Sequence, residues 1–169
     1  IEDPNLEDKT KLKIINLFAR ACGPKGMVEG QNRDILSENK ILTEEELDEI
    51  HYLKTGKLIE ACVMVVCLIK KDIDTDITEK LIKFSNKFGL AFQIVDDILD
   101  ATSNEEDLGK TTDLDSKQGK VNFVTLLGLE KSRKKVEDLI FQAKSELEKF
   151  SLNTENLTKI AEFVETRKN

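Results

Sequence analysis

The sequence predicts an all-α protein, and three observations support that prediction. Only two prolines and eight glycines interrupt the 169 residues, and Leu, Ile, Lys and Glu dominate the composition, which favours helices. Capping signatures precede stretches with helical spacing of apolar residues. No stretch has a convincing strand pattern. We therefore expect one helical bundle, a single domain over residues 1–169, in a chain long enough to bury roughly 68–70% of its unfolded surface.

The first part of the chain is expected to hold three helices. Amphipathic segments cover about residues 9–21 and 27–36, and the breaker pair Gly23-Pro24 separates them. Thr43, with a glutamate three residues later, forms a capping box ahead of a long helix over about 44–68.

The next helix begins with a similar signature. Asp76, with a glutamate three residues later, precedes a helix expected to run through Ala101. The helical spacing of apolar residues then ends, and residues 103–119 are expected to form a polar loop. Loops of that length in compact domains are usually functional or disordered.

Two more segments complete the predicted bundle. Asn122 is expected to cap a segment through Leu129 that continues into an amphipathic helix ending near Phe150. A last helix covers about 154–166. Both helices have apolar residues at the spacing that places them on one face.

Charge and cysteine content limit the class of function. Charged residues make up 35% of the chain and the net charge is −7, which argues against nucleic acid as a partner, because phosphate neutralisation needs a basic face. The three cysteines form no C-x-x-C pair, which fits a reducing cytoplasm.

No membrane span is expected. The longest apolar run, 61–69, has nine residues, about half of what is needed to cross a bilayer, and we interpret it as a buried core helix. The chain opens with Ile1 and without a basic-then-apolar leader, so we expect a processed or truncated product.

Three aspartates, Asp96, Asp97 and Asp100, interrupt a strongly apolar stretch. In a helix Asp96 and Asp100 share a face, while Asp97 lies about 100° round from Asp96. Unpartnered carboxylates in apolar surroundings are costly, so we expect a cation beside them. Carboxylate oxygens suit Mg²⁺, with water and substrate phosphates completing an octahedron. Gln93, one turn earlier, would face the same region. The alternative is an exposed helix end, with Gln93 an ordinary polar surface residue.

A second constellation is the string HYLKTG over residues 51–56. Gly56 inside a helix costs about 1 kcal/mol relative to alanine, and the Thr55 hydroxyl can bond back to the chain. A local kink with Lys54 beside it would suit an anionic ligand. Alternatively, Lys54 extends its charge to solvent and Gly56 admits a neighbouring helix. His51, the only histidine, is interpreted as a packed or capping residue.

The polar loop adds lysines, glycines and further aspartates near the aspartate helix. Lysines bind phosphate as point charges, and glycines allow close backbone approach; the alternative is an ordinary solvated loop. We expect carboxylates that hold Mg²⁺ and lysines that hold a diphosphate, next to an apolar helical interior. Together they predict a diphosphate ligand with an apolar hydrocarbon chain, as in isoprenoid chemistry.

Several strings resemble, in order, motifs of the trans-isoprenyl diphosphate synthases, the farnesyl and geranylgeranyl diphosphate synthases. GLAFQIVDDILD resembles the second aspartate-rich motif of that family. The match extends to Arg167-Lys168 and includes GMVEGQ, IHYLKTGKLIEA, LGKTTDLD and GKVNFVTLLGLEKSR.

The resemblance implies an all-α isoprenoid-synthase-type helical bundle, usually a homodimer, that joins isopentenyl diphosphate to an allylic diphosphate with Mg²⁺. It implies that Asp96, Asp97 and Asp100 help to hold Mg²⁺. Asp115 would lie in the outer shell around the metal ions. The resemblance also implies that diphosphate is bound by Lys54, Lys110 and Lys120. Thr55 and Gln93 would line the carbocation, with the Lys54 carbonyl assisting, and Phe92 would shape the pocket near the isopentenyl site.

The chain also departs from the family pattern. Glu29 stands where glycine is usual, Asp113 where glycine is frequent, and Asn122-Phe123 where Thr-Tyr is common. No first aspartate-rich motif is present, so the chain resembles only the C-terminal half of such an enzyme and is expected to be inactive alone. A non-catalytic subunit partnering an active homologue, and a terpene cyclase, remain alternatives.

Overall fold

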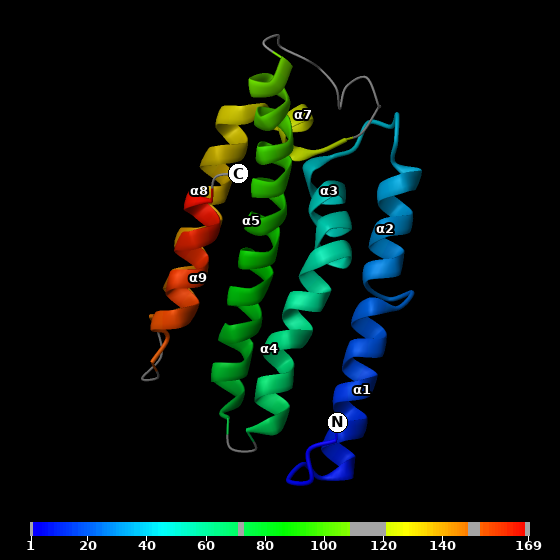
Figure 1. The fold of residues 1–169 in the computed structure, drawn as a ribbon, viewed down its shortest axis with the longest axis vertical. Helices are drawn as coiled ribbons and strands as arrows, with labels where there is room; N and C mark the ends of the chain where they lie inside the picture. The colour runs from blue at the N-terminus through cyan, green and yellow to red at the C-terminus, as the bar shows by residue number, and fades with distance from the viewer. Residues whose placement is uncertain (1, 71–72, 109–120, 149–152, 168–169) are drawn as a thin grey trace.

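The computed structural model describes residues 2–70, 73–108, 121–148 and 153–167. These residues form a helical bundle without a strand (Figure 1), which confirms the predicted all-α class. The helices are α1 (Asp8–Cys22), α2 (Met27–Leu36), α3 (Glu44–His51), the π-helical turn η1 (Tyr52–Gly56), α4 (Lys57–Ile69), α5 (Thr75–Leu108), α7 (Phe123–Leu127), α8 (Leu129–Leu147) and α9 (Glu155–Thr166).

The long helix α5 stands in the middle of the bundle, with α4, α1 and α2 on one side and α8 and α9 on the other (Figure 1). It packs against α4, η1, α7, α8 and α9. A helix that meets so many neighbours must be apolar around most of its circumference. This explains why the stretch around the aspartates reads as strongly apolar.

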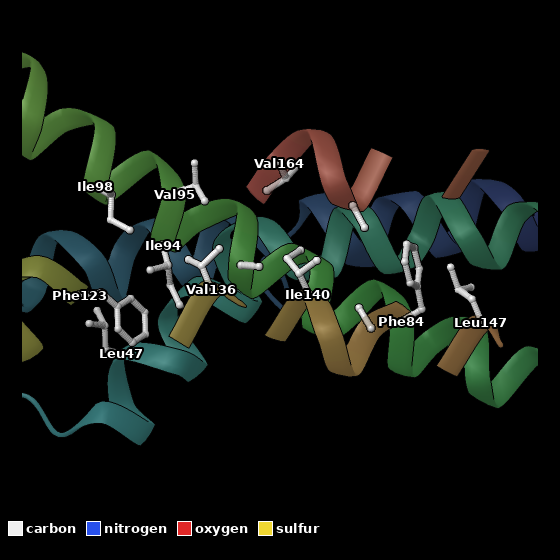
Figure 2. Close-up of a cluster of buried hydrophobic side chains, with 13 residues drawn as sticks. Leu47, Phe84, Ile94, Val95, Ile98, Phe123, Val136, Ile140, Leu147 and Val164 are labelled. Atoms are coloured by element: carbon white, nitrogen blue, oxygen red, sulfur yellow. The ribbon is translucent and has the colours of Figure 1, made fainter. Parts of the chain in front are cut away.

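The main core follows the contact between α5 and α8. Ile94 of α5 is fully buried, and so is Phe123 at the start of α7. Burying a side chain of this size contributes roughly 1.5–3 kcal/mol. Figure 2 shows the cluster, with labelled members Leu47, Phe84, Ile94, Val95, Ile98, Phe123, Val136, Ile140, Leu147 and Val164.

Two predicted helix caps are confirmed. The Thr43 hydroxyl accepts from the Glu46 backbone N–H at 3.2 Å, and the Glu46 carboxylate accepts from the Thr43 N–H at 2.8 Å. The Asn122 side chain and Thr125 form the same reciprocal pair at the start of α7. Each pair satisfies backbone donors that have no partner within the helix.

The third predicted cap is wrong, because the capping residue is Asp74 and not Asp76. The Asp74 carboxylate accepts from the Asp76 backbone N–H at 3.0 Å, and the helix starts at Thr75. Asp76 already lies in the first turn, where it pairs with Lys80 four residues on. Both acidic residues precede the same apolar run, so the motif alone did not distinguish them.

Three predicted boundaries also need correction. The loop expected from residue 103 is helical as far as Leu108, because no proline or glycine ends the helix before Gly109. The segment expected to be continuous through Leu129 breaks at Gly128, whose φ of 83° favours glycine. The following helix ends at Leu147, and residues 149–150 lie outside the described residues.

The predicted irregularity at Gly56 is confirmed as the π-helical turn η1. Two helices approach this turn closely. A Cβ added to Gly89 of α5 would lie 3.2 Å from the Gly56 Cα, and one added to Gly30 of α2 would lie 2.3 Å from the Lys54 backbone nitrogen. The glycines therefore set the spacing of α2, η1 and α5, as the alternative interpretation of Gly56 anticipated.

The apolar run 61–69 is less buried than expected. Within α4 only Ala61 is buried, while Cys62, Val66 and Ile69 are exposed. The reason is that α4 packs against α1 and α5, which leaves part of its apolar circumference uncovered. No helix in the described ranges is long and apolar enough to cross a membrane.

The Gly30 contact yields a stability prediction. Gly30→Ala should lower the free energy of unfolding by about 1–3 kcal/mol, because the new methyl group meets the Lys54 backbone and forces α2 away. Urea denaturation measures this loss. The control is Val28→Ala in the same helix, where the valine is exposed and little change is expected. Equal stability of Gly30→Ala and the parent would contradict the close approach.

Candidate functional site

The π-helical turn carries the first pair of candidate residues. The Lys54 ammonium donates to the Asp34 carboxylate of α2 at 2.7 Å. The side chain of Asp34 is 13% exposed and that of Lys54 is 26% exposed. The pair is therefore largely shielded from solvent but still accessible to a ligand. Gly30 makes this contact possible, since it lets α2 run directly beside the Lys54 backbone.

Asp34 was not predicted from the sequence. It lies three residues after Gln31, the last residue of the string GMVEGQ. Its partner is 20 positions away, so no helical spacing connects the two. The sequence offered one indication of a role for Asp34, its position about one helical turn after the string GMVEGQ. That indication is weak by itself.

Thr55 and Gln93, which the family resemblance assigns to the lining of the carbocation, lie in contact. The Thr55 hydroxyl donates to the Gln93 side-chain oxygen at 3.0 Å, joining η1 to α5. The Gln93 amide nitrogen in turn lies 3.5 Å from Asp97 Oδ1, one turn further along α5. Lys54 and Thr55 are therefore placed next to the helix that carries the aspartates.

The three aspartates of α5 have different surroundings. Asp96 is partly exposed, with 34% of its side chain accessible, and Asp100 is exposed. Asp97 is 4% exposed, and its Oδ2 accepts from the Phe123 backbone N–H at 3.1 Å. The helical spacing predicted that Asp97 lies on a different face from Asp96 and Asp100. In the structure Asp97 points into the bundle, and the other two aspartates lie on the accessible face.

The cation expected beside Asp96 is provided by the chain itself. The Arg167 guanidinium, directly after α9, donates to Asp96 Oδ1 at 2.9 Å. The same guanidinium lies 5.5 Å from the ring centre of Phe92, a distance typical of a cation–π contact. Burial raises the pKa of the Asp96 carboxyl above its usual value, against the opposing charge and hydrogen bond of Arg167.

The donor set fits one part of a magnesium site. Among the described residues no group of three or more His, Cys, Asp or Glu side chains could hold a metal. Mg²⁺, however, commonly takes only one or two protein carboxylates and completes its octahedron with water and substrate phosphates. Asp96 and Asp100, one turn apart on the accessible face of α5, are suited to that contribution.

Three predicted site residues cannot be placed relative to this cluster. Lys110, Asp115 and Lys120 lie outside the described residues. Asp113, one of the departures from the family pattern, lies in the same range.

His51 is a packed residue, as interpreted from the sequence. It is 3% exposed, and its ring stacks on Phe123 with 5.4 Å between centroids. Its Nε2 lies 3.6 Å from Asp97 Oδ2, too far for a hydrogen bond. Within the described part of the chain, neither ring nitrogen has a hydrogen-bond partner.

Glu29, the departure from glycine in the GMVEGQ string, does not disturb the site. Its carboxylate pairs with Arg33 one turn on at 2.7 Å, and Arg33 also reaches Glu49 of α3 at 2.9 Å. The position that requires glycine is the next one, Gly30. The substitution therefore adds a surface ion-pair network between α2 and α3 and leaves the close approach to Lys54 intact.

Comparison with known proteins places this arrangement in a family. Residues 5–157 match the family model of polyprenyl synthetase. The chain is 36% identical over 166 residues to the farnesyl diphosphate synthase of Haemophilus influenzae, covering 98% of this chain and 56% of that protein. It is 37% identical over 164 residues to the farnesyl diphosphate synthase of Escherichia coli, covering 95% of this chain and 55% of that protein.

The fold agrees with this family. A crystal structure of a geranyltransferase from Helicobacter pylori, complexed with magnesium and isoprenyl diphosphate, superposes with a TM-score of 0.78 at 34% identity, covering 96% of this chain and 53% of that one. This confirms the predicted isoprenoid-synthase-type bundle. The chain spans about half the length of the relatives it matches. It belongs to the polyprenyl synthetase family.

Proposed function

We propose that the intact protein is a Mg²⁺-dependent prenyltransferase that condenses isopentenyl diphosphate with an allylic diphosphate. Its relatives include farnesyl diphosphate synthases, and the site residues of this chain suit the same chemistry. In this proposal the chain contributes one of two facing halves of the site and is inactive by itself, because the family's first aspartate-rich motif is not in its sequence.

One observation supports this proposal above the others: η1 brings Thr55, the neighbour of Lys54 in the chain, against the turn of α5 that carries Gln93 and Asp96. Thr55 reaches Gln93 at 3.0 Å, and Gln93 precedes Asp96 by three residues, so both lie on one side of the helix. A cationic donor, neutral oxygens and accessible carboxylates are thereby grouped at the same level of the bundle.

Asp96 and Asp100 would supply carboxylate oxygens to Mg²⁺, with Asp115 in the outer shell. When bound, the metal neutralises the allylic diphosphate and assists its departure from carbon. The Arg167 guanidinium pairs with Asp96 at 2.9 Å and compensates the charge of that carboxylate.

The lysines and the neutral groups would act on the two ends of the substrate. Lys54, together with Lys110 and Lys120, would hold diphosphate oxygens through charge-assisted hydrogen bonds. The Thr55 and Gln93 oxygens and the Lys54 carbonyl would face the developing allylic cation, which fixed dipoles stabilise in a site shielded from water. Phe92 would form an apolar wall near the isopentenyl group.

We further propose that the protein works as a homodimer in the cytoplasm. Cys22, Cys62 and Cys67 are all free thiols, which fits a reducing compartment. The homodimer is what the resemblance to the family implies, and Val66 and Ile69, exposed three residues apart on one face of α4, are available for contact with a second copy.

The metal role of Asp96 can be tested by Asp96→Ala in the intact protein. Mg²⁺-dependent prenyl transfer should fall on the order of 100-fold or more, because a metal anchor is lost at the departing diphosphate. Steady-state assays with isopentenyl diphosphate and geranyl diphosphate measure this. Asp138→Ala, which removes an exposed carboxylate on α8, is the control. Undiminished turnover in Asp96→Ala would remove Asp96 from the mechanism.

The diphosphate role of Lys54 predicts a different outcome. Lys54→Ala should weaken binding of inorganic diphosphate with Mg²⁺ by about tenfold or more, since one charge-assisted hydrogen bond is lost. Calorimetry on the intact protein measures the affinity, and Lys131→Ala on the exposed face of α8 is the matched control. If both variants bind like the parent, Lys54 does not contact the diphosphate.

A further inference from the structure

The middle aspartate of the D-D-x-x-D string is oriented differently from the other two. Asp97 is 4% exposed, and both of its carboxylate oxygens lie beside groups of the protein. Oδ1 is 3.5 Å from the Gln93 amide nitrogen. Oδ2 accepts from the Phe123 backbone N–H at 3.1 Å and lies 3.6 Å from His51 Nε2.

We infer that Asp97 is a positioning residue, which anchors the start of α7 through the Phe123 N–H and does not ligate the metal. This inference rests on the proposed function, because it assigns different roles to the three aspartates of that site. Asp96 and Asp100 face outward to the metal, and Asp97 faces inward to the bundle.

The energetics favour this division. Phe123 is the first residue of α7, so its N–H has no acceptor within the helix, and the residue is fully buried. A buried donor without a partner costs roughly 1–3 kcal/mol. If Asp97 turned outward to a metal, Phe123 would lose its acceptor. The inward orientation satisfies both the carboxylate and the amide.

The surroundings hold Asp97 in this orientation. The His51 ring stacks on Phe123, with ring centroids 5.4 Å apart, and closes one side of the carboxylate. The Lys135 ammonium lies over the Phe123 ring, 4.5 Å from its centroid, and pairs with Glu44 and Asp48 of α3. Elements α3, α5, α7 and α8 therefore meet at this point.

Amide hydrogen exchange in the metal-free intact protein tests the anchor directly. In Asp97→Ala the Phe123 amide should exchange about tenfold faster or more, in excess of any change at the Ile140 amide in the core of α8, because its acceptor is gone. Asp97→Asn keeps an oxygen acceptor and should show a smaller excess. Asp96→Asn should show none. Without an excess at Phe123 in Asp97→Ala, the anchor is overturned.

Metal binding tests the second half of the inference. Calorimetry with MgCl₂ and inorganic diphosphate should show a loss of affinity of about tenfold or more in Asp96→Asn, while Asp97→Asn stays within about threefold of the parent. Equal losses in the two asparagine variants would make Asp97 a ligand and overturn the inference. If the parent itself binds no Mg²⁺ with diphosphate, the proposed function fails, and the exchange experiment decides the anchor alone.

Discussion

The burial of α5 is the constraint on which the rest of the structure depends. This helix packs against α4, η1, α7, α8 and α9, so its central stretch is mostly apolar, yet that stretch also carries three aspartates. The two demands are compatible because Asp96 and Asp100 lie on an accessible face, while Asp97 has hydrogen-bond partners inside. The position of the candidate site in the bundle follows directly from that arrangement.

The charged side chains of the candidate site are paired with opposite charges from elsewhere in the chain. Asp96 is paired with Arg167, and Lys54 is paired with Asp34. Each partner comes from a different helix, so the four charges also connect α2, η1, α5 and the end of α9. Groups suited to binding a metal or a diphosphate are thus already paired with opposite charges.

Backbone spacing around η1 is the second structural requirement. Gly30 and Gly89 allow α2 and α5 to approach the π-helical turn at distances that a methyl group would not permit without a shift. The turn itself displaces Lys54 and Thr55 from regular α-helical positions, as π-helical insertions often do at functional sites. Close packing and the irregular turn together bring the Thr55 hydroxyl within hydrogen-bond distance of Gln93.

The sequence by itself determined the helices, most of their boundaries and the family, because these depend on local signals. Apolar periodicity, the caps at Thr43 and Asn122, and the strings around Lys54 and Asp96 act over a few residues each. Only the tertiary structure decided that Asp34 partners Lys54, that Arg167 partners Asp96 and that Asp97 points inward to Phe123. These pairs are separated by 20, 71 and 26 positions, and such contacts are set by how the helices pack, which no local pattern encodes.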